Sequence, residues 1–421
     1  MESPQKLGAK QPIPPSPAAF KFNPLDPAFH QDPYPLYQRL RTEDPIHRNF
    51  FGSWVLTRYR DVKAILQDSR IVCDNLPERI RSKNPYLEKQ HKDLNALARI
   101  TSKWLLYLEP PDHTRLRRLV GKVFSPATVE KLRPKIQTTV DHLISQSESK
   151  GQMDIITDLA RPLPVLVIAE MLGIPADCNS EIFHWANEVS EIFDPLNSLE
   201  TFSRMNEIVI QFEQMLRQIV EERERQPQAD LISELIAARD EGDKLTTAEL
   251  ISVCMLLFGT GEETTVNLIG NGVLALLKHP EQLQRLRDHP ELIQSAVEEL
   301  LRYESPVQAI SRIAVEDIEL QGKTIKSGQQ VIVYLGAANR DPDQFPQPDQ
   351  LDIARPDNRH LAFAEGIHYC LGAFLARAEG QIAIKTLVQR FPQLRLLTPA
   401  PRWRKNISLR GLETLPISWV V

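Results

Sequence analysis

Apolar residues recur at helical spacing over much of this 421-residue chain. Helical periodicity, or a capping residue in front of an apolar run, predicts eight helices. They span residues 33–42, 59–68, 111–124, 126–146, 199–225, 246–278, 280–288 and 290–303. Residues 50–57 and 318–333 instead have a strand-like composition with turn residues between. Many long helices with a minority of short strands predict a mainly α fold of the α+β class.

The first 20 residues differ from the rest of the chain. Four prolines, at positions 12, 14, 15 and 17, predict an extended or disordered tail over residues 1–20. No later linker and no internal repeat is visible. Residues 21–421 are therefore expected to form a single large domain.

The composition narrows the class of protein. A hydrophobic content of 42% with 25% charged residues is typical of a globular protein with a substantial core. The net charge of -5 argues against nucleic acid as a partner. The four cysteines form no C-x-x-C pair, which argues against zinc and iron–sulfur sites. The N-terminus opens no apolar segment, and the most apolar window, Leu250 to Phe258, is too short to span a bilayer. We expect a cytoplasmic monomer that binds no membrane.

Cys370 carries the first chemical signal. It lies in the segment FAEGIHYCLG, with Gly366 four residues before it and Gly372 two residues after it, so the backbone can fold tightly around the sulfur. Residues 373–379 are predicted to open a helix, whose N-terminal N–H groups stabilise a thiolate. Such a sulfur can be a nucleophile or a metal ligand, and an inert buried cysteine is the plain alternative.

The pattern Phe-x-x-Gly-x-His-x-Cys-x-Gly, from Phe363 to Gly372, resembles the haem-ligand loop of the cytochrome P450 family. The resemblance implies that Cys370 binds the iron of haem b, with Phe363, Gly366, His368 and Gly372 forming its loop. It also implies a triangular helical domain with small β-sheets, in which the haem is buried between two helices.

The predicted helix over residues 246–278 carries the second signal. A capping box fixes its start, and its middle, FGTGEETT, places two glycines, two carboxylates and two threonines between apolar runs. The segment resembles the oxygen-activating helix of the same family, usually Ala-Gly-x-(Asp/Glu)-Thr. The resemblance implies that Gly261 opens the backbone beside the iron, that Glu263 relays protons and that Thr264 hydrogen-bonds the bound oxygen. Thr260 replaces the usual alanine, where it could narrow the pocket or hydrogen-bond a substrate.

Further positions follow from the same resemblance. Glu299 and Arg302 are expected to join Arg355 in a buried ionic network that supports the cysteine loop. The haem propionates are expected to be held by five cationic or donor side chains: His113, Arg117, Arg312, His360 and His368. The substrate pocket is expected to include Leu256, Gly259, Thr260, Val307, Ala309, Ile310, Leu412 and Glu413.

The implied activity is that of a monooxygenase, which inserts one atom of O2 into a C–H bond of a bulky, mostly apolar molecule, such as a secondary metabolite. No flavin or nicotinamide fingerprint is present, so electrons from NAD(P)H are expected through a ferredoxin and its reductase. Basic residues on the cysteine side (Arg115, Arg118, Lys122, Arg377) could steer such a partner or form a solvated helix face. The basic segment 75–103 could favour an acidic or carrier-bound substrate. An aryl-coupling or peroxide-using enzyme and a non-catalytic haem sensor remain alternatives.

Overall fold

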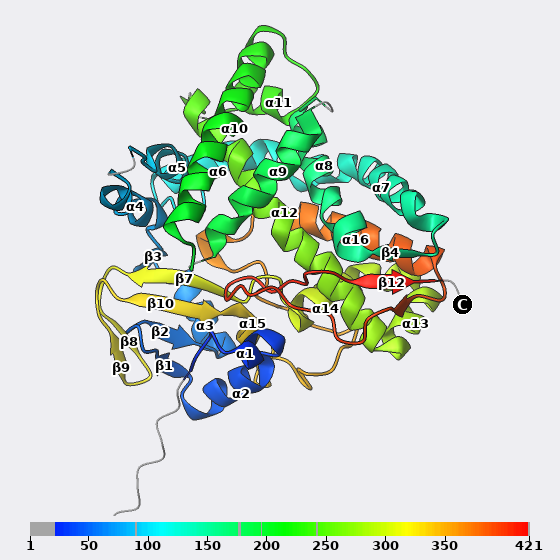
Figure 1. Ribbon diagram of the computed structural model, residues 1–421. Helices are drawn as coiled ribbons and strands as arrows, with labels where there is room; N and C mark the ends of the chain where they lie inside the picture. Colours follow the sequence, from blue (N-terminus) through cyan, green and yellow to red (C-terminus); the bar gives the residue numbers. More distant parts are fainter. Residues whose placement is uncertain (1–21, 89–90, 176–177, 195, 241–242, 420–421) are drawn as a thin grey trace, which may run out of the picture.

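The computed structural model describes residues 22–88, 91–175, 178–194, 196–240 and 243–419, and the proline-rich tail lies outside these ranges (Figure 1). Helices make up most of the described chain. They are α1 Pro27–Gln31, α2 Tyr34–Glu43, α3 Tyr59–Gln67, α4 Leu76–Arg81, α5 Asn95–Thr101, α6 Asp112–Val123, α7 Pro126–Glu148, α8 Pro162–Leu172, α9 Asn179–Ser190, α10 Leu199–Arg225, α11 Leu231–Ala237, α12 Thr247–Lys278, α13 Pro280–Asp288, α14 Ile293–Tyr303, α15 Leu335–Ala338 and α16 Ala373–Arg390.

Short strands and turns of tighter or wider helix complete the fold. The strands are β1 Ile46–Arg48, β2 Trp54–Leu56, β3 Ile71–Cys73, β4 Gln152–Asp154, β5 Arg239–Asp240, β6 Asp243–Lys244, β7 Ala309–Ala314, β8 Ile318–Leu320, β9 Lys323–Ile325, β10 Gln330–Tyr334, β11 Arg395–Leu396 and β12 Pro416–Ser418. The helical turns are η1 Asn84–Tyr86, η3 Ile155–Ala160, η5 Glu191–Phe193, η6 Pro290–Leu292 and η7 Gly366–His368. The mainly α class predicted from the sequence is confirmed.

All eight predicted helices are present, with ends that shift by a few residues. The predicted helix 290–303 begins as the turn η6 before it continues as α14. The predicted strand 318–333 divides into β8, β9 and β10. Helix α8 was not predicted because nearly all its residues are apolar and buried, so it has no polar face to produce a period.

A five-stranded sheet forms one side of the molecule (Figure 1). Its order is β1-β2-β10-β7-β3, with β10 parallel to β2 and the other pairs antiparallel. The register places Cys73 of β3 opposite Arg312 of β7. The sheet thus delivers two side chains from distant segments to the same edge.

Helix α12 runs through the helical side of the molecule, with α8, α9, α14 and α16 around it (Figure 1). Thr246 and Glu249 form the predicted capping box, which fixes its first turn. The helix is buried along most of its 32 residues, so it is apolar nearly all round. No helix in the described part of the chain is long and apolar enough to cross a membrane.

Candidate active site

The cysteine loop is held in a tight conformation between η7 and α16. The Cys370 N–H donates to the Phe363 carbonyl at 3.0 Å. Gly366 has φ +76°, and a Cβ on it would lie 2.4 Å from the Leu66 backbone oxygen, so only glycine fits. Gly372 is the N-cap of α16, and a Cβ there would lie 4.0 Å from the Cys370 sulfur. The steric requirement for glycine therefore applies to Gly366, since a Cβ on Gly372 would make only an ordinary van der Waals contact.

The surroundings of Cys370 act on its thiol in two directions. Burial raises the pKa of the Cys370 thiol, and the Gly372 N–H, Arg117 and Arg377 only partly offset this. The Gly372 N–H at the start of α16 thus acts in the predicted direction, and a thiolate stays a prediction because desolvation outweighs this contact. A metal cation beside the sulfur would supply the missing positive charge, since coordination deprotonates a thiol.

Four of the five predicted propionate ligands surround one buried space beside the loop. The His113 and His368 rings lie 4.5 Å apart, and Arg117 Nη2 donates to the Tyr369 carbonyl at 2.7 Å. Arg312 of β7 belongs to the same region. Its strand partner is Cys73, and the Cys73 sulfur lies 3.2 Å from His368 Nε2. Two helix residues, one strand residue and one loop residue therefore converge on one place.

This space fits the carboxylates of a haem. His113 is 3% exposed, and its Nε2 has no hydrogen-bond partner within the described chain. Burial, then His368 and Arg117, lower the pKa of His113 to about 4, so the ring is neutral and offers one N–H donor. A buried donor without a partner is costly, and an anionic group would satisfy it together with the two arginines.

His360 is not part of this cradle, and its predicted role is wrong. Its Nε2 lies 3.1 Å from Glu298 Oε2, and its Nδ1 accepts from the Ala362 N–H. Both ring nitrogens are therefore engaged. Glu298 also accepts from Arg377 at 2.7 and 2.9 Å, and the Arg377 guanidinium lies 4.4 Å from the centre of the Phe363 ring. This second network ties α14 and α16 to the cysteine loop, and the sequence analysis missed it.

The ionic network expected around Glu299 is present. Arg302 donates to Glu299 through Nε and Nη2 at 2.8 and 2.9 Å, and Arg355 Nε lies 3.1 Å from both carboxylate oxygens. Asn358 and the Asp352 N–H complete the shell of the carboxylate. Glu299 and Arg302 are fully buried, so every charge of the cluster is matched away from water.

The middle of α12 does not show the opening of the helix backbone that was predicted at Gly261. The helix is continuous, and a Cβ on Gly261 would lie 2.7 Å from Ile168 Cδ1 of α8. Gly261 therefore allows two helices to pack closely. Thr260 donates to the Leu256 carbonyl at 2.7 Å and Thr264 to the Thr260 carbonyl at 2.8 Å. Because the Thr260 hydroxyl is engaged with its own helix, its methyl group is what narrows the space beside it.

Two consecutive glutamates follow Gly261. Glu263 is 5% exposed and accepts from Arg404 Nη1 at 2.9 Å, with the Ser190 hydroxyl as a further partner. Burial raises the pKa of Glu263, and Arg404 opposes this. Glu262 is 3% exposed, and its Oε2 has no partner among the described residues. Burial raises its pKa to about 7.

The predicted pocket residues do not lie in one place, and they differ in burial. Leu256 and Ala309 are buried, and Val307 forms an isolated bridge with Leu409. Leu412 is buried beside the backbone of Gly270, far along α12 from Thr260. Glu413 is exposed and lies 3.4 Å from Arg402. The C-terminal segment thus contributes Arg404 to the Glu263 region, which the sequence analysis did not foresee.

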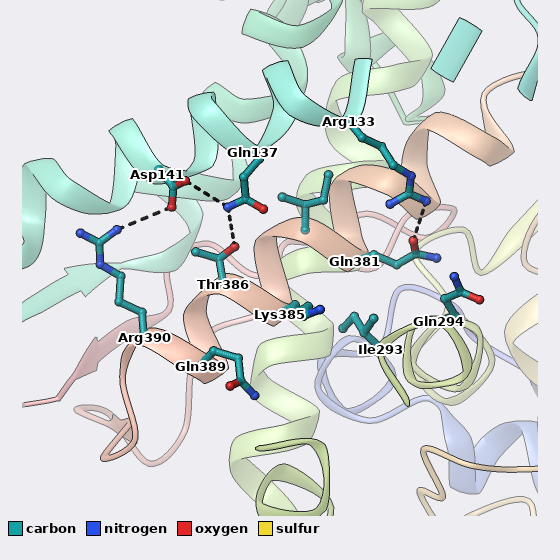
Figure 2. A pocket seen from close by; sticks show the side chains of 11 residues that line it. Arg133, Gln137, Asp141, Ile293, Gln294, Gln381, Lys385, Thr386, Gln389 and Arg390 are labelled. Atoms are coloured by element: carbon teal, nitrogen blue, oxygen red, sulfur yellow. Dashed lines mark hydrogen bonds and ion pairs between the residues drawn. The ribbon is translucent and has the colours of Figure 1, made fainter. Parts of the chain in front are cut away.

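A separate polar groove lies between α7, α14 and α16 (Figure 2). Arg133 donates to Gln381 at 2.8 Å and Gln137 to Thr386 at 3.0 Å across it. None of the predicted site residues lines this groove. Its hydrogen bonds join α7 to α16, and so brace the helix that begins behind Cys370.

The comparisons with known proteins agree with this geometry. Residues 55–396 match the family model "Cytochrome P450". The chain is 42% identical to the biotin biosynthesis cytochrome P450 of Bacillus subtilis, over 93% of this chain and 97% of the relative. It is also 42% identical to the polyketide biosynthesis cytochrome P450 PksS of the same organism, over 94% and 98%.

Solved structures show the same relationship. P450BioI, in complex with a hexadec-9Z-enoic acid-ligated acyl carrier protein, superposes with a TM-score of 0.87 at 41% identity, over 93% of this chain and 99% of that one. CalO2 superposes with a TM-score of 0.88 at 34% identity, over 95% and 99%. The family match and these relatives show that the chain belongs to the cytochrome P450 family, as a haem-dependent monooxygenase.

Proposed function

We propose that this monooxygenase inserts oxygen into a C–H bond of a bulky, mostly apolar molecule, with electrons from NAD(P)H through a ferredoxin and its reductase. The observation that carries the proposal is the pairing of the cysteine loop with an acid and an alcohol on α12. Glu379 of α16 hydrogen-bonds Thr265 of α12, which sets the helix after Cys370 against the turn that carries Thr264. The two halves of the site therefore belong together.

The haem, when bound, supplies the activation of O2, and the chain supplies the surroundings. Cys370 would hold the iron, while His113, Arg117, Arg312 and His368 would hold the carboxylates. The apolar residues of α12 on both sides of the glutamates exclude water. The Glu263 carboxyl can take up and release a proton, and the Thr264 hydroxyl can accept a further hydrogen bond while it donates to Thr260.

A free small molecule is the favoured substrate. The basic segment 75–103 could have formed a docking face for an acidic carrier. Four of its seven cations are instead paired with acidic side chains, two of which lie on α10. The pairs are Arg79–Asp74, Arg81–Glu78, Lys92–Glu207 and Arg99–Glu213, at 2.7, 2.8, 3.2 and 2.5 Å. This pairing lowers the unbalanced positive charge of the segment, which supports a substrate recognised by apolar contact.

Two of the four basic residues expected on the ferredoxin face have other partners. Arg115 pairs with Asp243 at 3.2 Å and with Glu249, and Arg377 pairs with Glu298. These contacts are internal and support the fold. The proposed electron donor therefore rests on the absence of a flavin or nicotinamide fingerprint in the sequence.

The proposal is tested by ligand titration of the haem-loaded protein, followed by turnover with NADPH, ferredoxin and reductase. A substrate should change the haem absorption spectrum and drive NADPH oxidation with formation of a hydroxylated or epoxidised product. Binding without NADPH oxidation would instead indicate a sensor, turnover with peroxide alone a peroxide-using enzyme, and a dimeric product an aryl-coupling enzyme. Selective turnover of a carrier-linked acyl chain would replace the free substrate.

The sulfur ligand is tested by Cys370→Ser, with Cys254→Ala as the matched control. Cys254 is also a buried cysteine, on α12. The reduced, CO-bound absorption band characteristic of a haem-thiolate protein should be lost in Cys370→Ser and kept in Cys254→Ala. Retention of the band in Cys370→Ser would contradict the assignment of the ligand.

A further inference from the structure

Glu262 is a buried acid that the proposed function does not use. The family pattern needs one acid before the threonine, which is Glu263. Glu262 stands one residue earlier, is almost fully buried, and leaves Oε2 without a partner in the described part of the chain. A second buried carboxyl beside the first is costly, and an apolar residue would pack there at no such cost. The position therefore calls for a role beyond packing.

Arg161 faces Glu262 from the junction of η3 and α8. It is the largest opposing charge on Glu262, although no ion pair within 4 Å forms between the two side chains. Arg161 Nη1 donates to Asn187 Oδ1 of α9 at 2.7 Å, while its Nε is buried and has no partner among residues that the structure describes. A buried, unsatisfied donor and a buried, unsatisfied acceptor thus belong to two side chains of opposite charge that act on each other, which is the setting in which an ordered water bridges two groups.

The same cluster connects Glu262 to Glu263 and to the surface. Glu263 is the like charge that acts on Glu262, and Arg404 acts on both. The Ser190 hydroxyl, which influences the pKa of Glu263, donates to the Asn187 carbonyl at 2.7 Å, and the Asn187 side chain accepts from Arg161, so α9 lies between the Arg161 end and the Glu263 end. Arg161 and Arg404 are both partly exposed. A chain of polar groups therefore leads from solvent to the acid nearest Thr264.

We infer that Glu262 is a positioning residue of the proton path, a reserve carboxyl that passes its proton to Glu263 through water held with Arg161. In this step the O–H bond of the Glu262 carboxylic acid breaks and an O–H bond forms on the Glu263 carboxylate, so the charge of the pair is unchanged. Glu262 then takes a proton from solvent through water beside Arg161, whose guanidinium stays protonated. The inference rests on the proposed monooxygenase function and adds a residue to it.

The protonation itself is tested by infrared difference spectroscopy of the full chain, with and without haem. A carboxylic-acid C=O band should disappear as the pH rises through about 7, be absent in Glu262→Gln, and persist in Glu263→Gln. Arg161→Gln should move its midpoint upward, because a nearby cation is lost, whereas Arg390→Gln, on the far groove, should not. Glu379→Gln identifies the band of the other buried acid, whose pKa is raised to about 8. A spectrum that Glu262→Gln or Arg161→Gln leaves unchanged overturns the inference.

The relay is tested by the autoxidation of dithionite-reduced, haem-loaded protein in air, in H2O and in D2O. This reaction needs neither substrate nor redox partner, so it still judges the inference if the proposed function fails. The wild-type rate and its solvent isotope effect should change between about pH 6 and 8 and become flat with pH in Glu262→Gln.

With a turnover substrate, Glu262→Gln should lower the product formed per O2 about tenfold at pH 7, less than the roughly 10²–10⁴-fold that a placed proton-transfer group contributes, because Glu263 is still present. Wild-type pH profiles in Glu262→Gln would show that Glu263 is supplied by another route. A purely structural role would lower thermal stability and leave these profiles in place.

Discussion

Two helices of this protein each carry a pair of consecutive glutamates, and the surroundings of the two pairs are opposite. Both glutamates of α12 and Glu299 of α14 are buried, while Glu298 is partly buried. On α14, Glu298 and Glu299 are matched by arginines, a histidine, an asparagine and a backbone N–H. His360 and Arg377 lower the pKa of Glu298 to about 2, although burial acts against them. On α12, Glu263 has one arginine and Glu262 has an unsatisfied oxygen, and the pKa of Glu262 is raised to about 7.

The difference distinguishes a structural role for the α14 pair from a proton-transfer role for the α12 pair. A carboxylate whose partners are all in place stays ionised and holds two helices and a loop in fixed positions, as the cysteine loop requires. An acid with too few partners sits between its two protonation states near neutral pH, as proton transfer requires. The glutamates of α14, on the cysteine side of the site that must stay rigid, are thus paired with cations. The glutamates of α12, on the side that must move protons, are not fully paired.

The largest effect is expected from Glu299→Gln. It leaves the buried Arg302 and the largely buried Arg355 without an anion, which should lower the free energy of unfolding by about 3–5 kcal/mol. Urea denaturation of the haem-loaded protein measures this. The control is Glu130→Gln, which breaks a pair with Arg133 at the same spacing but on the surface, and should cost less than about 1 kcal/mol. Equal losses in the two variants would remove the distinction between buried and exposed pairs.

Glu298→Gln should cost about 3 kcal/mol at pH 7, and the cost should shrink with acid. The pKa of Glu298 is about 2 in the folded chain, below the value near 4.5 of an unfolded glutamate, so its stabilisation is present above pH 4.5 and is lost as the pH falls towards 2. Unfolding at pH 7 and at about pH 3.5, with and without the substitution, measures the difference. A cost that is the same at both pH values would mean that packing, and not charge, accounts for the loss.

Glu262→Gln should have the opposite sign. The pKa of Glu262 is about 7 when folded, above its unfolded value, so the folded state holds the proton more tightly and loses stability as the pH rises from 4.5 to above 7. The glutamine should therefore raise the free energy of unfolding by about 2 kcal/mol at pH 8 and change little at pH 5, because part of the gain is offset by the buried amide. Denaturation curves at both pH values provide the measurement. A less stable variant at pH 8 would place Glu262 in a fixed ion pair with Arg161.

The parts of this site that the sequence predicted are those encoded within one segment. Cys370 with its glycines, and Glu299 with Arg302 three residues later, are visible as short motifs. The missed contacts join segments that only the fold brings together, since Arg404 is 141 residues from Glu263 and Arg377 is 79 residues from Glu298. The same limit explains why His360 was assigned to the haem: its residue type suited a carboxylate, and its actual partner was on another helix.

The secondary structure was likewise predicted only in part. The short helices α4 and α11 have side-chain caps but were missed, whereas α12, with its capping box at Thr246, was predicted. The apolar helix α8, which packs against Gly261, was not. The continuity of α12 also had no sequence signal, because it depends on Thr260 and Thr264 donating to carbonyls of their own helix.

The smallest expected effect concerns backbone strain in the cysteine loop, on the side of the site where the glutamates are paired with cations. Ala364, in the cysteine loop, has φ +59°, a conformation that costs an L-residue about 1–2 kcal/mol. Glycine removes this cost but adds about 0.5–1 kcal/mol of chain entropy to the unfolded state, so Ala364→Gly should stabilise the protein by about 0.5–1 kcal/mol. The control is Gln347→Gly, at an exposed position with φ +49° outside the cysteine loop, which should gain a similar amount by thermal denaturation without altering haem retention. If Ala364→Gly instead lowers stability, the contact of its methyl group with the sheet core outweighs the strain, and the loop is held by packing as much as by its ion pairs.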